Sequence, residues 1–304
     1  MQIGFRHWAV LGVLVTLWGS SYLAVEFALA MFQPAQIVAL RVLTGAVVLL
    51  IASLAGRHAL PRDLRHWGWF LAIAVVGNCL PFFLISWGQQ QVESGLAGIL
   101  AASTPLVVML LAHFLLDDER LSRGQALAFL LGFAGIVVLM GPDSLAALGG
   151  SGDRLLSQLA VFGGAFCYAV ATVSARFMPA AHPVVTSTGV MLLATALMGR
   201  WGFSGAALLP GADTKVIGAI GFLGLMGTGV ASILYFYLIQ ETGARFTSLL
   251  NYLVPVWAVA LGAWVLGERL PITSWLALGM ILGALVLMRD SAAGPRSASV
   301  AAKD

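Results

Sequence analysis

The chain has 304 residues, of which 60% are apolar and only 10% are charged, with a formal net charge of +3. A water-soluble domain of this length would need more charge to cover its surface, so lipid must be the solvent for most of the chain. The basic residues are scattered between apolar runs rather than gathered in one patch, which argues against nucleic acid as a partner. Cys79 and Cys167 lie inside apolar runs without the spacing of metal ligands, so we expect no metal, cofactor or disulfide.

Ten apolar stretches are long enough to cross a bilayer, because a helix needs about 20 apolar residues to span a hydrocarbon core of about 30 Å. The first stretch is too long for the apolar part of a signal peptide and is expected to remain a membrane span. The sequence therefore predicts an all-α integral membrane protein with ten transmembrane helices. In chain order they cover residues 8–30, 34–54, 67–88, 94–116, 122–141, 155–177, 183–201, 215–240, 244–266 and 271–289.

The second half of the chain repeats features of the first half. Gly77 corresponds to Gly227 and Pro105 to Pro255, at an offset of 150 residues in both pairs, and the hinge at 118–121 (DERL) corresponds to 267–270 (GERL). Self-similarity at a fixed offset is typical of a duplicated architecture. We expect a first five-helix repeat over residues 1–142, a linker over 143–154, a second five-helix repeat over 155–290, and a disordered tail over 291–304.

The distribution of Lys and Arg predicts the orientation of the spans. Eleven of them fall on the side of the N-terminus and only four on the other side, so both termini are expected to be cytoplasmic. With five spans in each half, the second half must then enter the membrane from the opposite face, which makes the repeat inverted. The eleven are Arg6, Arg57, Arg62, Arg65, Arg120, Arg123, Arg176, Arg245, Arg289, Arg296 and Lys303, and the four are Arg154, Arg200, Lys215 and Arg269.

Several polar and aromatic side chains lie deep within the spans, where each needs a partner or a water-filled space. We expect them to line a substrate cavity between the two halves, suited to a zwitterionic or partly aromatic metabolite of amino-acid size. Packing between helices remains an alternative role for the aromatic ones. The expected substrate-binding residues are Trp18, Tyr22, Arg41, Asn78, Tyr168, Tyr235 and Asn251.

Arg41 lies about seven residues inside the second span. A guanidinium at this depth keeps its charge and must find an acceptor. One interpretation is an ion pair with Glu26 that fixes two helices, and the other is that Arg41 holds an anionic group of the substrate.

Prolines occupy matching positions in the fourth helix of each half. Ser103 and Thr104 precede Pro105, and Asn251 stands four residues before Pro255. Each proline indicates either a tolerated kink or an interrupted helix that borders a cavity.

Taken together, these motifs resemble those of an EamA-type member of the drug/metabolite transporter superfamily. The resemblance rests on residues 18–21 (WGSS), residues 39–41 (ALR), and the two proline-bearing helices with their hinges. It implies ten helices in two tandem units and export of amino acids, other metabolites or drugs across the bacterial inner membrane. The first half departs from the family pattern, with DDERL at 117–121 and three glutamines at 89–91, and these departures leave the substrate open.

Two other classes of function compete with transport. Residues 149–152 (GGSG) superficially match the serine motif of intramembrane proteases, but no histidine stands in a facing span, so we expect no catalytic residues and no enzyme. A non-transporting membrane scaffold would not need polar residues in its midplane. The expected partners are a small-molecule substrate and the lipid bilayer, with either a monomer or a homodimer as the assembly.

Overall fold

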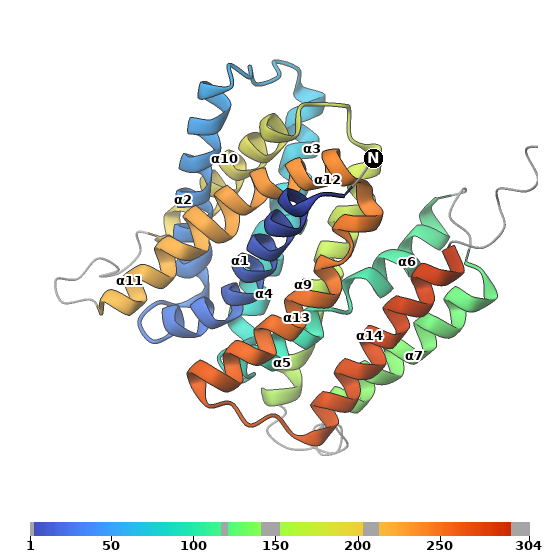
Figure 1. Cartoon of the computed structure of the whole chain (residues 1–304). Coiled ribbons are helices and arrows are strands. Elements are labelled where there is room, and N and C mark those ends of the chain that lie inside the picture. Colours follow the sequence, from blue (N-terminus) through green and yellow to red (C-terminus); the bar gives the residue numbers. More distant parts are fainter. Residues whose placement is uncertain (1–2, 117–120, 141–152, 203–212, 293–304) are drawn as a thin grey trace, which may run out of the picture.

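A computed structural model of the chain describes residues 3–116, 121–140, 153–202 and 213–292. Every regular element in these ranges is helical (Figure 1), as the sequence predicts. Among the described residues, eight helices are long and apolar enough to cross a membrane, and two shorter apolar helices cover Leu250–Leu266 and Ile272–Met288. The chain is therefore a multi-pass, all-helical membrane protein.

The first half contains seven α-helical segments, because two of its spans are interrupted. The third span joins α3 to α4 through the π-helical segment η1, and the fourth is divided into α5 and α6. The segments are α1 Phe5–Leu29, α2 Pro34–Ala55, α3 Leu64–Ala74, η1 Val75–Cys79, α4 Leu80–Gly88, α5 Ser94–Ala101, α6 Thr104–Leu115 and α7 Arg123–Met140.

The second half follows a similar plan with different interruptions. Its third span also contains a π-helical segment, η4, and another, η5, ends its fourth span. The segments are α9 Asp153–Ser174, the 3-10 turn η3 Ala175–Phe177, α10 Pro183–Gly202, α11 Thr214–Gly221, η4 Phe222–Val230, α12 Ala231–Thr247, α13 Leu250–Leu261, η5 Gly262–Leu266 and α14 Ile272–Ala292.

Two glycines with positive φ angles mark changes of chain direction in the second half. Gly243 (φ 77°) interrupts the helical backbone of α12, close to the predicted boundary between the eighth and ninth spans. Gly267 (φ 68°) ends η5 in the left-handed conformation. Glycine adopts this conformation without the steric cost that a Cβ atom brings. Gly267 thereby frees the next residue, Glu268, to leave the helix axis.

Helices at matching positions of the two halves pack together in opposite directions. The His58 ring, just beyond α2, stacks on His182, just before α10, with ring centroids 3.9 Å apart, and Thr188 donates to the Leu49 carbonyl at 3.1 Å. The end of α2 thus lies beside the start of α10. Similarly, Gly135 of α7 faces Met280 and Gly132 faces Ala284, so α7 and α14 are antiparallel neighbours (Figure 1).

The end of the bundle at which α1 begins is called the N-terminal end, and the other end is called the opposite end. At the N-terminal end, where α1 begins, Trp8 packs edge-on against Phe246 with centroids 4.9 Å apart, and His7 lies 3.9 Å from the Glu241 carboxylate. The connection from α13 to α14 lies at the opposite end (Figure 1).

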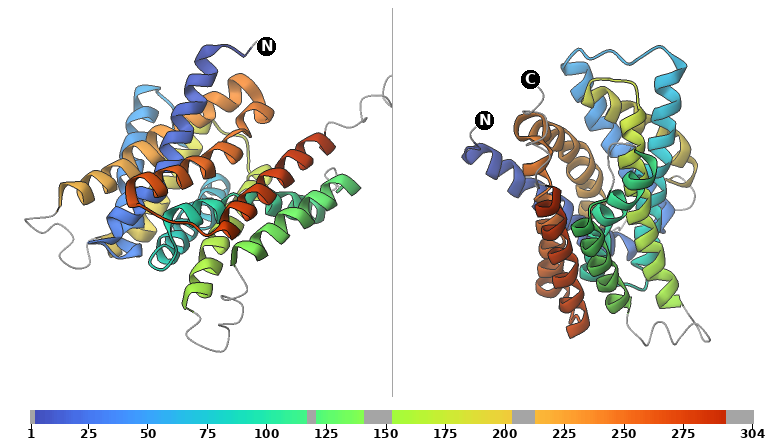
Figure 2. Two further views of the ribbon diagram at one scale, coloured as in Figure 1. Left: turned by 60° about the horizontal axis from the view of Figure 1, so that its bottom comes forward. Right: turned by 90° about the vertical axis from the view of Figure 1, so that its right-hand side faces the viewer.

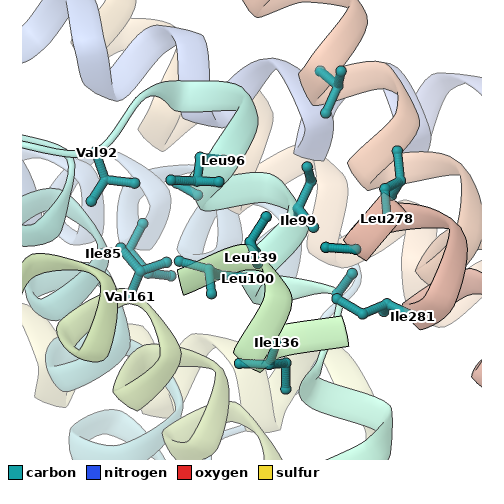
Figure 3. Packing of buried hydrophobic residues seen from close by; sticks show 14 residues of the cluster. Ile85, Val92, Leu96, Ile99, Leu100, Ile136, Leu139, Val161, Leu278 and Ile281 are labelled. Atoms are coloured by element: carbon teal, nitrogen blue, oxygen red, sulfur yellow. The ribbon is translucent and has the colours of Figure 1, made fainter. Parts of the chain in front are cut away.

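The largest apolar core is built around α5, whose residues from Ser94 to Leu100 are all buried. Figure 3 shows how side chains from both halves meet there. Lipid tails are as apolar as leucine, so close packing must hold these helices together rather than a drive to leave water. The labelled contributors are Ile85 of α4, Val92, Leu96, Ile99 and Leu100 in and before α5, Ile136 and Leu139 of α7, Val161 of α9, and Leu278 and Ile281 of α14.

The antiparallel pair of α7 and α14 stands to one side of the remaining helices in the left view of Figure 2. Large apolar side chains on these two helices, including Leu127, Leu130 and Trp275, are exposed. Lipid is the solvent that such a surface requires.

Gly88 allows α4 and α9 to approach closely. A Cβ atom added there would lie 2.6 Å from the Ser157 carbonyl oxygen and 2.5 Å from a Val161 methyl group. Gly88→Ala should therefore lower the melting temperature of the detergent-solubilised protein, because overpacking of this kind costs about 1–3 kcal/mol. Gly12→Ala is the matched control, since nothing lies within 4 Å of the added atom. Equal melting temperatures for the two variants would show that the α4–α9 contact is not tight.

Candidate functional site

A cavity of about 490 Å³ lies between the two halves. Its wall includes all seven residues that the sequence singles out, although they come from six different elements. Trp18 and Tyr22 are on α1, Arg41 on α2, Asn78 on η1, Tyr168 on α9, Tyr235 on α12 and Asn251 on α13. Tertiary structure thus brings together side chains from widely separated parts of the chain.

The aromatic residues both line the cavity and join the halves. Trp18 contacts Tyr235 with ring centroids 5.3 Å apart, and Tyr168 meets Phe82 edge-on at 6.4 Å. Each pair links one helix of the first half with one of the second. The two roles proposed for these aromatic side chains, cavity wall and interhelical packing, are therefore compatible.

Arg41 is the one deeply buried cation among the described residues of the cavity wall, with only 9% of its surface exposed. Its Nε donates to Thr228 Oγ1 at 2.9 Å, and its Cζ lies 3.7 Å from the centroid of the Phe82 ring. The ring face supplies a favourable cation–π contact. Within the described part of the chain no carboxylate lies within 4.0 Å of the guanidinium, and neither Nη atom donates a hydrogen bond.

The predicted ion pair between Glu26 and Arg41 is absent. Arg41 is directed toward Thr228 and Phe82, whereas Glu26 lies toward the opposite end, where Glu268 and Glu93 are its electrostatic neighbours. Glu26 Oε2 is buried and has no hydrogen-bond partner among the described residues. Glu26 and Arg41 lie on consecutive helices, but their side chains do not face each other.

Sequence reasoning missed the π-helical segments and the residue that holds Arg41. Thr228 lies in η4 and donates its own hydroxyl proton to the Leu223 carbonyl at 2.9 Å. Asn78, which lies in η1, donates to the Ile73 carbonyl at 3.3 Å. The sequence did contain a signal that could have identified Thr228 as a site residue. It stands 150 residues after Asn78, at the equivalent position of the repeat, and between Gly227 and Gly229.

The two prolines behave differently in the two halves. Pro105 stands in the first turn of α6, just after a break at Ala102–Ser103, where a missing N–H costs nothing. Pro255 lies inside the continuous helix α13, and the chain instead breaks before it, at residues 248–249. The expectation of an interrupted helix therefore holds for Pro105, whereas Pro255 is accommodated within its helix.

Polar contacts join the two halves at the opposite end of the bundle. The Glu268 carboxylate accepts hydrogen bonds from the backbone N–H of Ser94 at 2.8 Å, from the Ser94 hydroxyl at 2.7 Å and from the backbone N–H of Gly95 at 2.9 Å. A carboxylate of the second half thus caps the start of α5 in the first half, where the helix dipole favours negative charge. Nearby, Gln89 Nε2 donates to the Tyr22 carbonyl at 2.9 Å.

The lining side chains differ in exposure between the two ends of the cavity. Ser21, Ser86 and Gln89, toward the opposite end, are buried, whereas Thr172 and Asn251 are exposed. Asn251 belongs to the first turn of α13, which begins at the N-terminal end, a few residues after Phe246, which contacts Trp8. We therefore expect the cavity to open toward the N-terminal end.

Cysteine labelling tests this opening. In a background lacking Cys79 and Cys167, Asn251→Cys should react readily with a small water-soluble thiol reagent, because the side chain is exposed on the cavity rim. Ser157→Cys is the control, since Ser157 is 2% exposed and is packed between helices. Labelling of the protein in lipid nanodiscs measures both rates, and similar rates for the two variants would contradict an open rim at Asn251.

Comparison with known proteins supplies the family. The chain is 27% identical over 282 residues to the uncharacterized inner membrane transporter YedA of Escherichia coli K12, covering 90% of this chain and 88% of YedA. It is 26% identical over 305 residues to a probable terminal-alkyne amino-acid exporter of Streptantibioticus cattleyicolor, covering 98% of each chain. A solved crystal structure, 21% identical, has the same fold with a TM-score of 0.64 over 93% of this chain and 96% of that chain.

The model of the EamA-like transporter family matches residues 7–141 and 155–289, which together make up most of the sequence. The two matches follow one another as tandem units. The chain belongs to the EamA-like transporter family.

Proposed function

We propose that this protein exports small metabolites of amino-acid size across the bacterial inner membrane, and that it binds them in the cavity between its halves. The proposed substrate-binding residues are the seven predicted ones: Trp18, Tyr22, Arg41, Asn78, Tyr168, Tyr235 and Asn251. Family membership supports membrane transport of a small molecule, and the naming of one relative as an amino-acid exporter supports this size class.

The environment of Arg41 is the observation that carries the proposal. A permanent cation buried beside an aromatic ring, with no carboxylate of the described residues within 4.0 Å, has lost part of its hydration without gaining a counter-charge from them. The carboxylate of a substrate would supply that charge. Because the side chain already uses Nε on Thr228, its two Nη groups remain to form a forked contact with two carboxylate oxygens.

Alternating access between two inverted repeats is the mechanism that we propose for transport. It is supported by the antiparallel packing of α2 with α10 and of α7 with α14. Corresponding helices of two inverted five-span repeats are expected to run in opposite directions in this way. Rocking one half against the other could open a central cavity to each side in turn. Opening the opposite end would require Glu268 to release Ser94 and Gly95, because that contact joins the two halves.

An intramembrane enzyme and a membrane scaffold are the competing functions. The serine motif at 149–152 lies outside the described residues, and relatives named as transporters favour transport over catalysis. Purified protein in liposomes separates the three functions. Movement of a solute without chemical change supports a transporter, and product formation supports an enzyme. The absence of both supports a scaffold.

Orientation is the first prediction of the proposed function. The bias of eleven basic residues to four predicts that both termini are cytoplasmic. A cavity open at the N-terminal end would then face the cytoplasm, as an exporter requires for loading. Alkaline phosphatase fused after His66 should be inactive, and the same enzyme fused after Gly150 should be active. The reverse pattern would contradict the orientation, and comparable immunoblot levels of the two fusions control for expression.

The second prediction concerns Arg41. Arg41→Ala should reduce amino-acid flux in proteoliposomes at least about tenfold, since hydrogen bonds to charged groups contribute about 1.5–3 kcal/mol each. Arg41→Lys should retain part of the flux, because lysine keeps the charge but lacks the planar fork.

Glu26→Gln is the control for this series. Because Glu26 makes no ion pair with Arg41, the substitution should not reproduce the loss. Wild-type flux in Arg41→Ala, at equal amounts of reconstituted protein, would rule out a role for Arg41 in binding.

A further inference from the structure

The π-helical segments of the two third spans, η1 and η4, form similar hydrogen bonds at equivalent positions of the two halves. Asn78 in η1 donates to the carbonyl of Ile73, and Thr228 in η4 donates to the carbonyl of Leu223. Donor and acceptor are five residues apart in both cases, which is the spacing of a π-helix rather than that of an α-helix. Both polar side chains also line the cavity. Each half therefore contributes one residue that is anchored to its own backbone and borders the central space.

The anchored residue of the second half is an acceptor for Arg41. Because the Thr228 hydroxyl gives its single proton to Leu223, its oxygen can only accept from Arg41 Nε. This contact fixes one edge of the planar guanidinium. The other edge, with its two Nη groups, makes no hydrogen bond to the described residues. Thr228 thus sets the direction in which Arg41 presents its remaining donors.

The anchored residue of the first half meets no such cation. At the offset of 150 residues, Arg41 corresponds to Met191 of the second half, which is buried in an apolar cluster. The Asn78 amide uses Nδ2 on the Ile73 carbonyl, which leaves Oδ1 as an acceptor without a hydrogen bond among the described residues. These equivalent positions therefore give the cavity a donor fork, from the Arg41–Thr228 pair, and an acceptor, Asn78 Oδ1.

We infer that these two positions read the two charged groups of one substrate. Arg41, oriented by Thr228, takes the carboxylate, and Asn78 Oδ1 accepts a hydrogen bond from the ammonium group. The substrate class is an amino acid with both groups free, lying across the interface between the halves. This inference rests on the proposed function and adds that a free ammonium group is required. The cavity volume of about 490 Å³ is large enough for such a ligand.

Competition in proteoliposomes tests the inference. The twenty radiolabelled L-amino acids are screened first, and the one with the highest uptake is then competed with its N-acetyl derivative and its carboxamide. Wild-type protein should bind each derivative at least about tenfold more weakly than the parent amino acid, because each loses one charge-assisted hydrogen bond. Equal competition by the N-acetyl derivative would overturn the assignment of Asn78 without any need for a variant.

Substitutions then assign each end to its residue. Asn78→Leu should weaken binding of the amino acid about tenfold and leave that of the N-acetyl derivative unchanged, and Asn78→Asp, which retains an acceptor, should preserve the preference for a free ammonium. Thr228→Val should selectively reduce discrimination against the carboxamide, whereas Thr228→Ser should retain it. An equal loss for all ligands in Asn78→Leu would show that Asn78 only stabilises its helix.

Thr195→Val is the matched control for Thr228→Val. The Thr195 hydroxyl also donates to a backbone carbonyl, that of Met191 at 2.8 Å, but Thr195 does not line the cavity. Its selectivity should equal that of the wild type. If no amino acid is carried but a carboxylate without an amino group, such as benzoate, is carried, the inference fails while the proposed function stands. If neither kind of solute is carried, both fail.

Discussion

The hydrogen bond from Arg41 to Thr228 is the interaction on which the arrangement of the site depends. It joins α2 of the first half to η4 of the second and lies at the wall of the cavity between them. The contact requires the two helices to approach closely. A Cβ atom added at Gly224 would lie 2.9 Å from the Arg41 carbonyl oxygen, and one added at Gly45 would lie 2.9 Å from the Thr228 methyl group. Small residues on both helices thus bring a permanent cation and its acceptor together.

The absence of water in the bilayer core explains the other polar contacts of the described residues. Where α5 ends, the hydroxyls of Ser103 and Thr104 donate to the carbonyls of Leu100 and Ala101, at 2.6 and 2.8 Å. Where α5 begins, the Glu268 carboxylate accepts from two backbone N–H groups. An unsatisfied backbone group in lipid costs several kcal/mol, so a broken helix within the membrane must be compensated by side chains. The central helix can therefore be short because both of its ends are capped.

The two halves have a similar arrangement of helices but differ at residues that border the cavity. Asn78 and Thr228 are equivalent in position and backbone geometry, yet only Thr228 meets a cation. The fourth span breaks at residues 102–103 in the first half and at 248–249 in the second. Perfect repeats would create a cavity with identical ends. The departures from symmetry give this cavity chemically different ends.

The sequence by itself determined the spans, the duplication and the residues around the cavity. Span length follows from bilayer thickness, and the duplication is visible at an offset of 150 residues. Polar or aromatic side chains deep in a span need either a partner or a water-filled space. These are local properties of a segment, so Trp18, Tyr168 and Asn251 could be singled out without knowing which helices touch.

Only the tertiary structure decided which side chains meet. One interpretation of the sequence paired Arg41 with Glu26, on the preceding helix, but the observed partners are Thr228 and Phe82. A helix that is apolar on every side carries little information about its rotation, because lipid and protein neighbours have similar polarity. Contacts such as Glu268 with Ser94 join residues 174 positions apart, and only the packed bundle brings them within hydrogen-bond distance.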